Sequence, residues 1–429
     1  MAQKEPIGVI GVGWVGLCTA ACFAELGHPV YARDIVPEKV ESLARGEVSM
    51  HEPGLPELVR KNAERLTFTT DMGHVLENAQ LLFCCVDTPP TYSGDADLSR
   101  VEAVIAELGG SPEHAIVMKS TVPVGTGRSI SRRFEELGYV SNPEFLKEGS
   151  AVEDFMQPDR VVVGAGDRAA RFADRVAALY EPTGGEIVRT DVESAEFIKL
   201  ASNAFLATKI SFINEIANVC DEFGADVNEV ARGMGLDDRI GPKFLRAGIG
   251  WGGSCFGKDV LSLKQLAGNT GYHFQLLTAV MEVNELQKRR TISKLQKHLG
   301  SLVGKQIALL GISFKPDTDD VRDATSLVLA ARLHGEGAHV RAYDPVAGAR
   351  ARELLVGTTL ADSALEALDG ADAAVLVTEW PEFAELDWAG EVMERMASPI
   401  VVDGRNFLDR DGLRTDGFTY EGIGRYVVP

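Results

Sequence analysis

The 429-residue sequence is poor in cysteine, in basic charge and in long apolar runs. Its six cysteines are too few and too unevenly spaced for a disulfide framework, and none has zinc-finger spacing. No charge-free stretch is long enough to span a membrane, and the amino-terminal segment has no signal-peptide layout. We therefore expect a reducing, cytoplasmic location, with no metal centre and no membrane partner.

Basic residues are scarce relative to acidic ones. Lys and Arg number 43 against 63 Asp and Glu, which gives a formal net charge of −20. No basic stripe is present to neutralise phosphates, so a nucleic-acid partner is not expected. An anionic small ligand would have to meet local positive charge, so basic residues beside motifs become the candidates for binding one.

The apolar pattern predicts an α/β protein with two doubly wound Rossmann-like domains joined by a helical middle. Continuous apolar runs at 81–86, 115–119 and 161–164 are typical of strands buried on both faces of a parallel sheet. A long, uninterrupted helix is expected from Glu193 to Phe223, and strand–turn–helix order restarts at Gly304. We place the domains at residues 1–192, 193–298 and 299–429.

The chain opens with a dinucleotide fingerprint. The motif GVGWVG, with Gly11, Gly13 and Gly16, lies between an apolar run and a helical stretch. These glycines supply a tight turn and a close approach of the backbone to a pyrophosphate at a helix amino terminus. The next strand ends on Asp34, where an acid accepts ribose hydroxyls and repels a 2′-phosphate. NAD is therefore expected rather than NADP, with Arg33 beside Asp34 as the counter-argument.

The densest group of reactive side chains is Gly250-Trp251-Gly252-Gly253-Ser254-Cys255-Phe256-Gly257-Lys258-Asp259. Glycines let a backbone close on a ligand, and a nearby cation favours the nucleophilic thiolate over the thiol. A single cysteine is more often a buried structural residue. Here it follows two glycines and precedes a lysine and an aspartate, in a chain with a cofactor fingerprint. The combination predicts a cysteine-assisted, nicotinamide-dependent oxidation.

Three further patterns have both a structural and a functional interpretation. Lys199 and Asn203 share one face of the long helix, which small apolar neighbours predict to be half-buried, so that Lys199 could stabilise an oxyanion. Glu144 and Glu148, in SNPEFLKEG, could be an ordinary helix cap. Arg405 follows an apolar strand, at the sheet edge where open α/β sheets bind ligands.

Taken together, these segments resemble the UDP-glucose/GDP-mannose dehydrogenase family of nucleotide-sugar 6-dehydrogenases over essentially the whole chain. The motifs that carry the resemblance are GVGWVG, Glu52–Leu55, Ser120–Thr126, SNPEFLKEG, Lys199 with Asn203–Ala207, GIGWGGSCFGKD, FKPDTDDVR and DGRN. Residues 154–160, DFMQPDR, resemble the branch that acts on UDP-glucose. The resemblance implies a four-electron oxidation of UDP-glucose to UDP-glucuronate with two NAD and one water. The alternative is the same chemistry on GDP-mannose or a UDP-N-acetylhexosamine.

The resemblance also implies roles for individual residues. Cys255 would add to the intermediate aldehyde, giving a thiohemiacetal and then a thioester that water cleaves. Lys199 and Asn203 would stabilise oxyanions. Asp259, Thr121 and Glu144 would position and activate water, with the base of each step left open.

By the same resemblance, many residues would bind ligands. NAD contacts are expected from Gly11, Gly13, Val15, Gly16, Asp34, Lys39, Thr88, Thr121, Glu148, Lys258 and Arg322. Nucleotide-sugar contacts are expected from Glu144, Phe145, Leu146, Lys147, Glu148, Lys199, Asn203, Arg239, Phe244, Leu245, Gly252, Phe256, Lys315 and Arg405. Arg239 would reach the substrate of a neighbouring subunit, so a homodimer built on the long helix is implied. The three domains would then bind NAD, form the dimer and bind the UDP-sugar, in chain order.

The sequence departs from the family pattern at three places. Gly257 stands where proline is usual, Trp251 replaces a smaller aromatic residue, and Asp87 precedes Thr88 where a small or neutral residue is usual. A carboxylate at Asp87 would weaken NAD binding unless it points away. Two other classes are disfavoured by the cysteine loop: a two-electron hydroxyacid dehydrogenase does not need Cys255, and a catalytically silent nucleotide-sugar sensor would not need to keep it.

Overall fold

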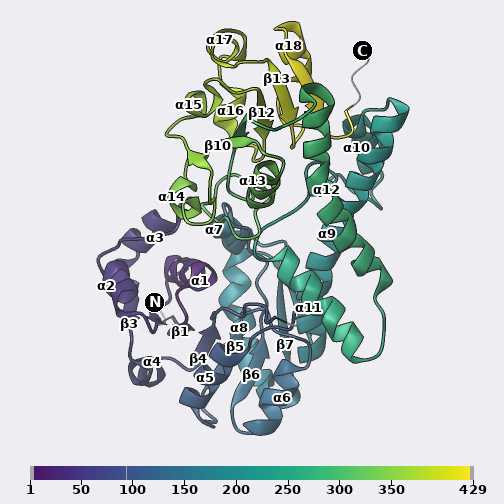
Figure 1. The fold of residues 1–429 in the computed structure, drawn as a ribbon. Helices are drawn as coiled ribbons and strands as arrows, with labels where there is room; N and C mark the ends of the chain where they lie inside the picture. The colour runs from purple at the N-terminus through teal and green to yellow at the C-terminus, as the bar shows by residue number, and fades with distance from the viewer. Residues whose placement is uncertain (1–3, 93, 426–429) are drawn as a thin grey trace. The chain divides into compact units, whose positions relative to one another are not determined.

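A computed structural model describes residues 4–92 and 94–425 (Figure 1). The chain divides into two compact units, Met1–Ser202 with Leu261–Tyr272, and Asn203–Val260 with His273–Pro429. Each unit contains one sheet of mainly parallel strands with helices packed on it. The predicted α/β class with two doubly wound domains is therefore confirmed.

The first unit is built on an eight-stranded sheet in the order β3-β2-β1-β4-β5-β6-β7-β8. Its strands are β1 (Ile7–Ile10), β2 (Val30–Arg33), β3 (Leu66–Thr69), β4 (Leu81–Cys84), β5 (Ala115–Met118), β6 (Gly138–Ser141), β7 (Arg160–Ala165) and β8 (Glu186–Thr190). The order reverses between β1 and β4, so ligands are expected beyond the carboxyl ends of these two strands.

One strand pair differs from the expected parallel pattern. β6 and β7 run antiparallel, although β7 contains the predicted buried run at 161–164 and pairs in parallel with β8. A strand that is apolar on both faces has the same sequence pattern in either direction, so the run predicts burial but not orientation.

Helices cover both faces of this first sheet. They are α1 (Trp14–Glu25), α2 (Pro37–Ala44), α3 (Leu55–Lys61), α4 (Met72–Asn78), α5 (Ser99–Leu108), α6 (Thr126–Arg133), α7 (Ala151–Met156) and α8 (Ala170–Tyr180). α1 begins immediately after the glycine turn and is lined with small buried residues, which lets it pack closely on the strands. The fingerprint thereby places a helix amino terminus at the end of β1.

A helical region follows the first sheet. Its helices are α9 (Val192–Phe223), α10 (Val227–Gly235), α11 (Phe256–Asn269) and α12 (Gln275–Leu299). α9 is a single helix of 32 residues, so the predicted uninterrupted helix from Glu193 to Phe223 is confirmed. Among the described residues, no helix has both the length and the apolar character needed to cross a bilayer.

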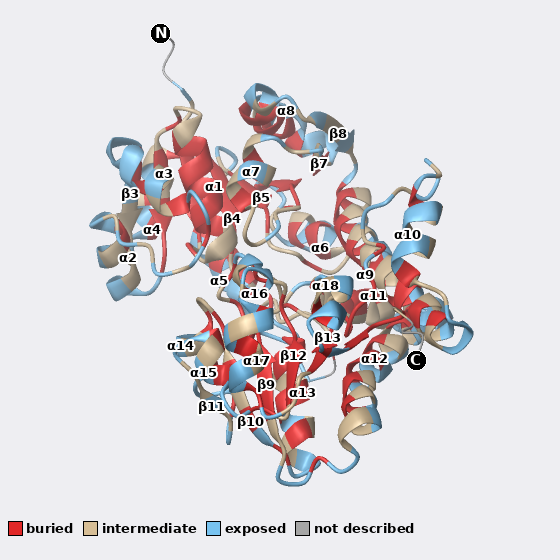
Figure 2. Cartoon of the chain, turned by 90° about the horizontal axis from the view of Figure 1, so that it is seen from above, coloured by how far each residue is buried: buried red, intermediate tan, exposed pale blue. Residues whose placement is uncertain are grey.

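The second sheet has six parallel strands in the order β11-β10-β9-β12-β13-β14. Its strands are β9 (Gln306–Leu310), β10 (His339–Tyr343), β11 (Thr359–Leu360), β12 (Ala373–Leu376), β13 (Ile400–Asp403) and β14 (Thr419–Gly422). Its helices are α13 (Thr325–Gly335), α14 (Gly348–Ala351), α15 (Ala364–Leu368), α16 (Pro381–Ala384), α17 (Met393–Arg395) and α18 (Arg410–Thr415). Figure 2 shows β12 and β13 as buried, as expected of strands covered on both faces.

Candidate active-site residues

The glycine turn after β1 has the geometry of a dinucleotide cradle. Gly11 has φ +88°, and a Cβ on Gly16 would lie 1.8 Å from the Gly11 carbonyl oxygen, so neither position tolerates a side chain. A Cβ on Gly13 would meet nothing within 4 Å, so the backbone there is open to a ligand. Val15 lies in the first turn of α1. These residues fit a pyrophosphate at the helix amino terminus.

Asp34 lies at the end of β2, where a ribose-binding acid belongs. Its Oδ2 accepts hydrogen bonds from the Val12 amide and from Lys39 Nζ, both at 3.0 Å, and its Oδ1 accepts from the Val36 amide at 3.1 Å. Burial works to raise the pKa of Asp34, but Lys39 and the two amides hold it below its ordinary value. Asp34 is therefore a carboxylate at neutral pH, as discrimination against a 2′-phosphate requires.

Two charges near this cradle raised doubts from the sequence. Arg33 is paired with Glu107 at 3.1 Å and also donates to the Thr70 carbonyl, so its charge is compensated by Glu107. Asp87 is exposed and lies 2.8 Å from Arg100, so its charge is also compensated. Neither residue counts against NAD.

The first unit contains a buried ion pair that joins two predicted site residues. Lys199 Nζ on α9 lies 2.7 Å from Glu144 Oε1, in the loop after β6. Glu144 Oε2 also accepts from the Leu146 amide. Burial works to raise the pKa of Glu144, but Lys199, the Leu146 amide and Lys119 hold it below its ordinary value. The SNPEF loop is thus more than the helix cap that its pattern allowed.

A second buried lysine, which the sequence patterns did not single out, lies behind this pair. Lys119, directly after β5, donates to Asn142 Oδ1 at 3.2 Å, and Tyr180 Oη donates to the same oxygen at 2.8 Å. Burial lowers the pKa of Lys119 to about 8, against the opposing effects of Cys85 and Glu144. The two hydrogen bonds fix Asn142, two residues before Glu144. Its position directly after an apolar strand was the feature of the sequence that could have indicated a buried lysine.

Two buried carboxylates, also missed, hold the neighbouring loops. Glu196 on α9 accepts from the Gly125 and Gly127 amides, at 2.7 and 2.8 Å, and so anchors the loop after Thr121. Thr88 Oγ1 donates to the Thr121 carbonyl at 2.7 Å.

Glu52 is the second of these carboxylates. It accepts from Trp14 Nε1 and from the amides of Gly149 and Ala151, each at 2.8 Å, and so ties the glycine turn to the end of SNPEFLKEG. Glu52 was part of the recognised motif EPGL, yet the pattern gave it no role.

In the second unit, Cys255 lies directly before α11 and is exposed. The thiol therefore precedes a helix amino terminus, and Lys258 follows three residues later. A Cβ on Gly252 would lie 2.4 Å from the Asp323 carbonyl oxygen, and one on Gly253 2.7 Å from the Phe314 ring. The two glycines before the cysteine are therefore required by packing.

Asp259 and Asn203 are brought together. Asn203 Nδ2 donates to Asp259 Oδ2 at 2.6 Å, and Lys258 Nζ lies 3.8 Å from Asp259 Oδ1. Asp259 is 1% exposed, and its amide donates to the Cys255 carbonyl at 2.9 Å as the first turn of α11 forms. A buried carboxylate is thus held one helical turn from the thiol, a suitable place for positioning a water molecule.

Arg405 lies at the carboxyl edge of the second sheet, as its sequence position predicted. Its guanidinium donates to three main-chain carbonyls, of Val377, Gly250 and Phe314, at 2.6, 3.2 and 3.3 Å. These bonds join three loops at the edge where a ligand is expected, and the guanidinium also lies 3.5 Å from Oε2 of Glu379.

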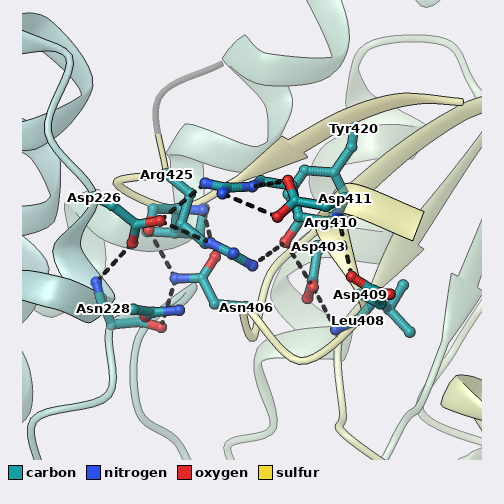
Figure 3. A network of polar contacts seen from close by, with 12 residues as sticks. Asp226, Asn228, Asp403, Asn406, Leu408, Asp409, Arg410, Asp411, Tyr420 and Arg425 are labelled. Atoms are coloured by element: carbon teal, nitrogen blue, oxygen red, sulfur yellow. Dashed lines mark hydrogen bonds and ion pairs between the residues drawn. The ribbon is translucent and has the colours of Figure 1, made fainter. Parts of the chain in front are cut away.

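The turn that carries Arg405 is itself anchored. Asp403 accepts from the Phe407 and Leu408 amides and from Tyr420 Oη, and burial raises its pKa. Arg410 and Arg425 lie beside this group and both pair with Asp226 (Figure 3).

The remaining predicted residues fall into two groups. Lys147, Arg239 and Arg322 are exposed cations paired with nearby acids, namely Asp154, Asp237 and Asp320. Phe145, Leu146, Glu148, Phe244, Phe256 and Lys315 are partly exposed, whereas Leu245 is buried. Arg160 stacks over the Phe145 ring at 3.6 Å, and Phe244 has φ +65°, a conformation that a non-glycine residue rarely adopts.

Comparison with known proteins gives the chain its family. Residues 5–184 match the NAD binding domain of the UDP-glucose/GDP-mannose dehydrogenase family, residues 193–286 its central domain and residues 308–410 its UDP binding domain. The chain belongs to this family. The predicted resemblance and the predicted NAD cofactor are confirmed.

Relatives cover nearly the whole chain. The UDP-glucose 6-dehydrogenase TuaD of Bacillus subtilis is 44% identical, over 99% of this chain and 94% of its own length. The UDP-glucose 6-dehydrogenase of Pseudomonas aeruginosa is 45% identical over 97% of both chains. A solved UDP-glucose dehydrogenase from the archaeon Pyrobaculum islandicum is 36% identical, with a TM-score of 0.91 over 99% of both chains.

Proposed function

We propose that the protein oxidises UDP-glucose to UDP-glucuronate, with two NAD reduced and one water consumed per sugar. The observation that carries the proposal is Cys255, exposed directly before α11 and one helical turn from the buried Asp259, in a chain whose fingerprint fits NAD. A two-electron dehydrogenase has no use for such a thiol. The relatives that cover the whole chain act, by their names, on UDP-glucose.

In the first oxidation, the sugar 6-hydroxyl loses its proton and the attached carbon loses a hydride to NAD, leaving an aldehyde. We assign Lys199 to the stabilisation of the developing oxyanion, because its charge is buried and preorganised. Glu144 Oε1 lies 2.7 Å from the lysine Nζ and compensates its charge. Bound NAD supplies the hydride acceptor, while the residues of this chain hold the oxygen and receive the proton.

In the second oxidation, the Cys255 thiolate forms a carbon–sulfur bond with the aldehyde. The resulting thiohemiacetal carbon carries a hydrogen again, and its loss as hydride to a second NAD leaves a thioester. Water then adds, the carbon–sulfur bond breaks, and the thiol recovers a proton as the acid leaves. Asp259, with Asn203 as its hydrogen-bond donor, is assigned to positioning that water.

The remaining parts of the proposal concern assembly and location. On α9, the apolar residues Phe205, Phe212, Val219 and Phe223 are all exposed, and their spacing places them along a common side. We propose that this stripe pairs with the same stripe of a second copy, in a homodimer. The division at residues 1–192, 193–298 and 299–429 belongs to the same proposal. So does a cytoplasmic location, because a reducing compartment preserves the Cys255 thiol.

The test is to count NADH formed per sugar consumed, with excess NAD and purified protein. Two NADH and UDP-glucuronate from UDP-glucose are expected. Cys255→Ala is expected to bind both ligands and to form no uronic acid; full uronic acid formation by this variant would remove the thioester step. Turnover of GDP-mannose or a UDP-N-acetylhexosamine in place of UDP-glucose would favour the alternative substrate.

A further inference from the structure

The segment Gly248–Trp251, which leads to Cys255, is buried but belongs to no helix or strand. Its main-chain groups therefore need other partners. The Gly248 amide donates to Asn214 Oδ1 at 2.8 Å, and the Gly248 carbonyl accepts from Gln287 Nε2 at 2.9 Å. A buried irregular segment can be stable only when such groups are satisfied.

Asn284 of α12 binds the other end of the segment. The Trp251 amide donates to Asn284 Oδ1 at 2.8 Å, and Asn284 Nδ2 donates to the Trp251 carbonyl at 3.0 Å. One amide side chain thus satisfies both main-chain groups of one residue, as a neighbouring strand would. Asn284 itself is only 2% exposed.

The close packing of the segment explains why two of its residues are glycines. Gly250 has φ +95°, and a Cβ there would lie 2.7 Å from Asn284 Oδ1. A Cβ on Gly248 would lie 2.7 Å from the Gly404 carbonyl oxygen. Asn284 therefore fits against a backbone that has no side chain at Gly250. The sequence pattern Gly-Ile-Gly-Trp has a packing reason that is separate from ligand binding.

We propose that Asn284 and Gln287 are positioning residues for the nucleophile. Their amides fix the main chain of Gly248–Trp251, and this sets where the Cys255 thiol stands when the aldehyde forms. Trp251 precedes the cysteine by four residues, and the two glycines between them pack closely against Asp323 and Phe314, which limits how the loop can adjust. The inference rests on the proposed function, because it gives the thiol a reaction whose rate depends on placement. A shift of about 1 Å can cost roughly 100-fold in rate.

The variants that test this remove the amides while keeping side-chain volume. Asn284→Leu removes both bonds to Trp251, and Gln287→Met removes the bond to Gly248. Asn62→Leu is the matched control: Asn62 is also 2% exposed, but its amide donates to Glu25 and to the Leu58 carbonyl in the first unit. The control loses a buried amide without touching the nucleophile loop.

The expected result is a kcat lowered by roughly 10- to 100-fold in both test variants, with KM for UDP-glucose and for NAD within about twofold of the parent protein. The ratio of NADH to sugar is expected to fall from two toward one, with aldehyde trapped by hydroxylamine. The control should retain both the parental kcat and the ratio. Parental kcat and ratio in a folded test variant, or an equal loss in the control, would overturn the proposal.

Two measurements do not depend on turnover. Hydrogen exchange at the Trp251 amide should speed up at least about tenfold in Asn284→Leu and stay unchanged in Asn62→Leu. The alkylation rate of Cys255 by iodoacetamide, followed by mass spectrometry, should change in both test variants and not in the control. If Asn284→Leu does not fold, Gln287→Met carries the test alone. If the parent protein forms no uronic acid, the proposed function fails, while these two measurements still decide the positioning role.

Discussion

Lys199 Nζ and Glu144 Oε1 lie 2.7 Å apart with only 5% and 7% of their side chains exposed. The lysine comes from α9 and the glutamate from the loop after β6, so the contact joins two distant parts of the sequence. Two buried charges of opposite sign depend on each other, because either one alone would be uncompensated. The pair is therefore a constraint on the fold as well as the proposed oxyanion site.

Removal of one partner should destabilise the protein strongly. Glu144→Gln or Lys199→Met is expected to lower the free energy of unfolding by about 3–5 kcal/mol at pH 7, because the remaining charge stays buried. The double variant should lose less than the sum of the two single losses. Urea denaturation followed by fluorescence measures all four proteins. Additive losses would show that the contact carries no coupling.

The pH dependence of the free energy of unfolding provides a second test of the same pair. The pKa of Glu144 is held below its ordinary value, so its stabilising effect is present above the unfolded pKa of about 4.3 and is lost as the pH falls through the folded pKa. The stability difference between the parent protein and Glu144→Gln should shrink below about pH 4. Glu47→Gln, which breaks the exposed Arg45–Glu47 pair, serves as a control and should leave stability unchanged at pH 7.

Cofactor choice should depend on Asp34. Loss of its carboxylate removes the ribose acceptor and the repulsion of a 2′-phosphate. Asp34→Ala is therefore expected to weaken NAD binding by roughly 10- to 100-fold. The ratio of the affinity for NAD to the affinity for NADP should become smaller. Titration calorimetry with both cofactors measures the change. An unaltered preference would mean that another group discriminates between the cofactors.

Glu107 provides the companion test for Arg33. Because Glu107 pairs with Arg33, Glu107→Ala should make the arginine available to a 2′-phosphate. Added to Asp34→Ala, it should improve NADP binding further, whereas alone it should change little while Asp34 remains. Comparing NADP binding by the single and double variants therefore distinguishes the contribution of Asp34 from that of Arg33.

Local patterns predicted the parts of the site whose geometry is local. The glycine turn and Asp34 follow from residue spacing around one strand–helix–strand unit, and the shared face of Lys199 and Asn203 follows from helix periodicity. The partners of buried polar groups were not predictable in this way. Glu196 meets Gly125, and Lys119 meets Asn142, across separations that only the folded chain brings together.

The direction of β7 could not be predicted from the sequence either, for a related reason. The run in β7 was correctly predicted as buried, but its antiparallel pairing with β6 depends on how the chain reaches the strand. Between the two strands lies the SNPEFLKEG loop with α7, which turns the chain back. Burial is encoded in the strand, whereas orientation is decided by the connection.

Lys119 should make stability increase with pH in the alkaline range. Burial lowers its pKa to about 8, below the unfolded value of about 10.4. Between these values the unfolded chain binds more protons than the folded one, so the free energy of unfolding rises with pH. Relative to Lys119→Met, the parent protein should gain roughly 3 kcal/mol between pH 8 and 10.5. Denaturant titrations across this range measure it; a constant difference would show that Lys119 does not titrate there.

Charge on the apolar stripe of α9 should abolish the proposed dimer. Phe205 and Phe212 are 65% and 49% exposed, and a glutamate at either position would bury a charge in the interface. Sedimentation velocity should show a dimer for the parent protein and a monomer for Phe205→Glu and Phe212→Glu. Leu354→Glu, an equally exposed apolar position outside the stripe, should remain dimeric.

The dimer proposal also makes a prediction about activity, because Arg239 is expected to serve the neighbouring subunit. Arg239 is 87% exposed and pairs with Asp237, two residues before it, so the fold leaves its side chain accessible to a second copy. Arg239→Ala and Cys255→Ala should each abolish uronic acid formation as pure homodimers.

When the two proteins are dissociated and reassociated together, a mixed dimer contains one site with an intact thiol and an intact partner arginine. Up to about a quarter of the parental activity should then return, as random pairing in a twofold dimer requires. If verified mixed dimers regain no activity, Arg239 acts in the active site of its own subunit.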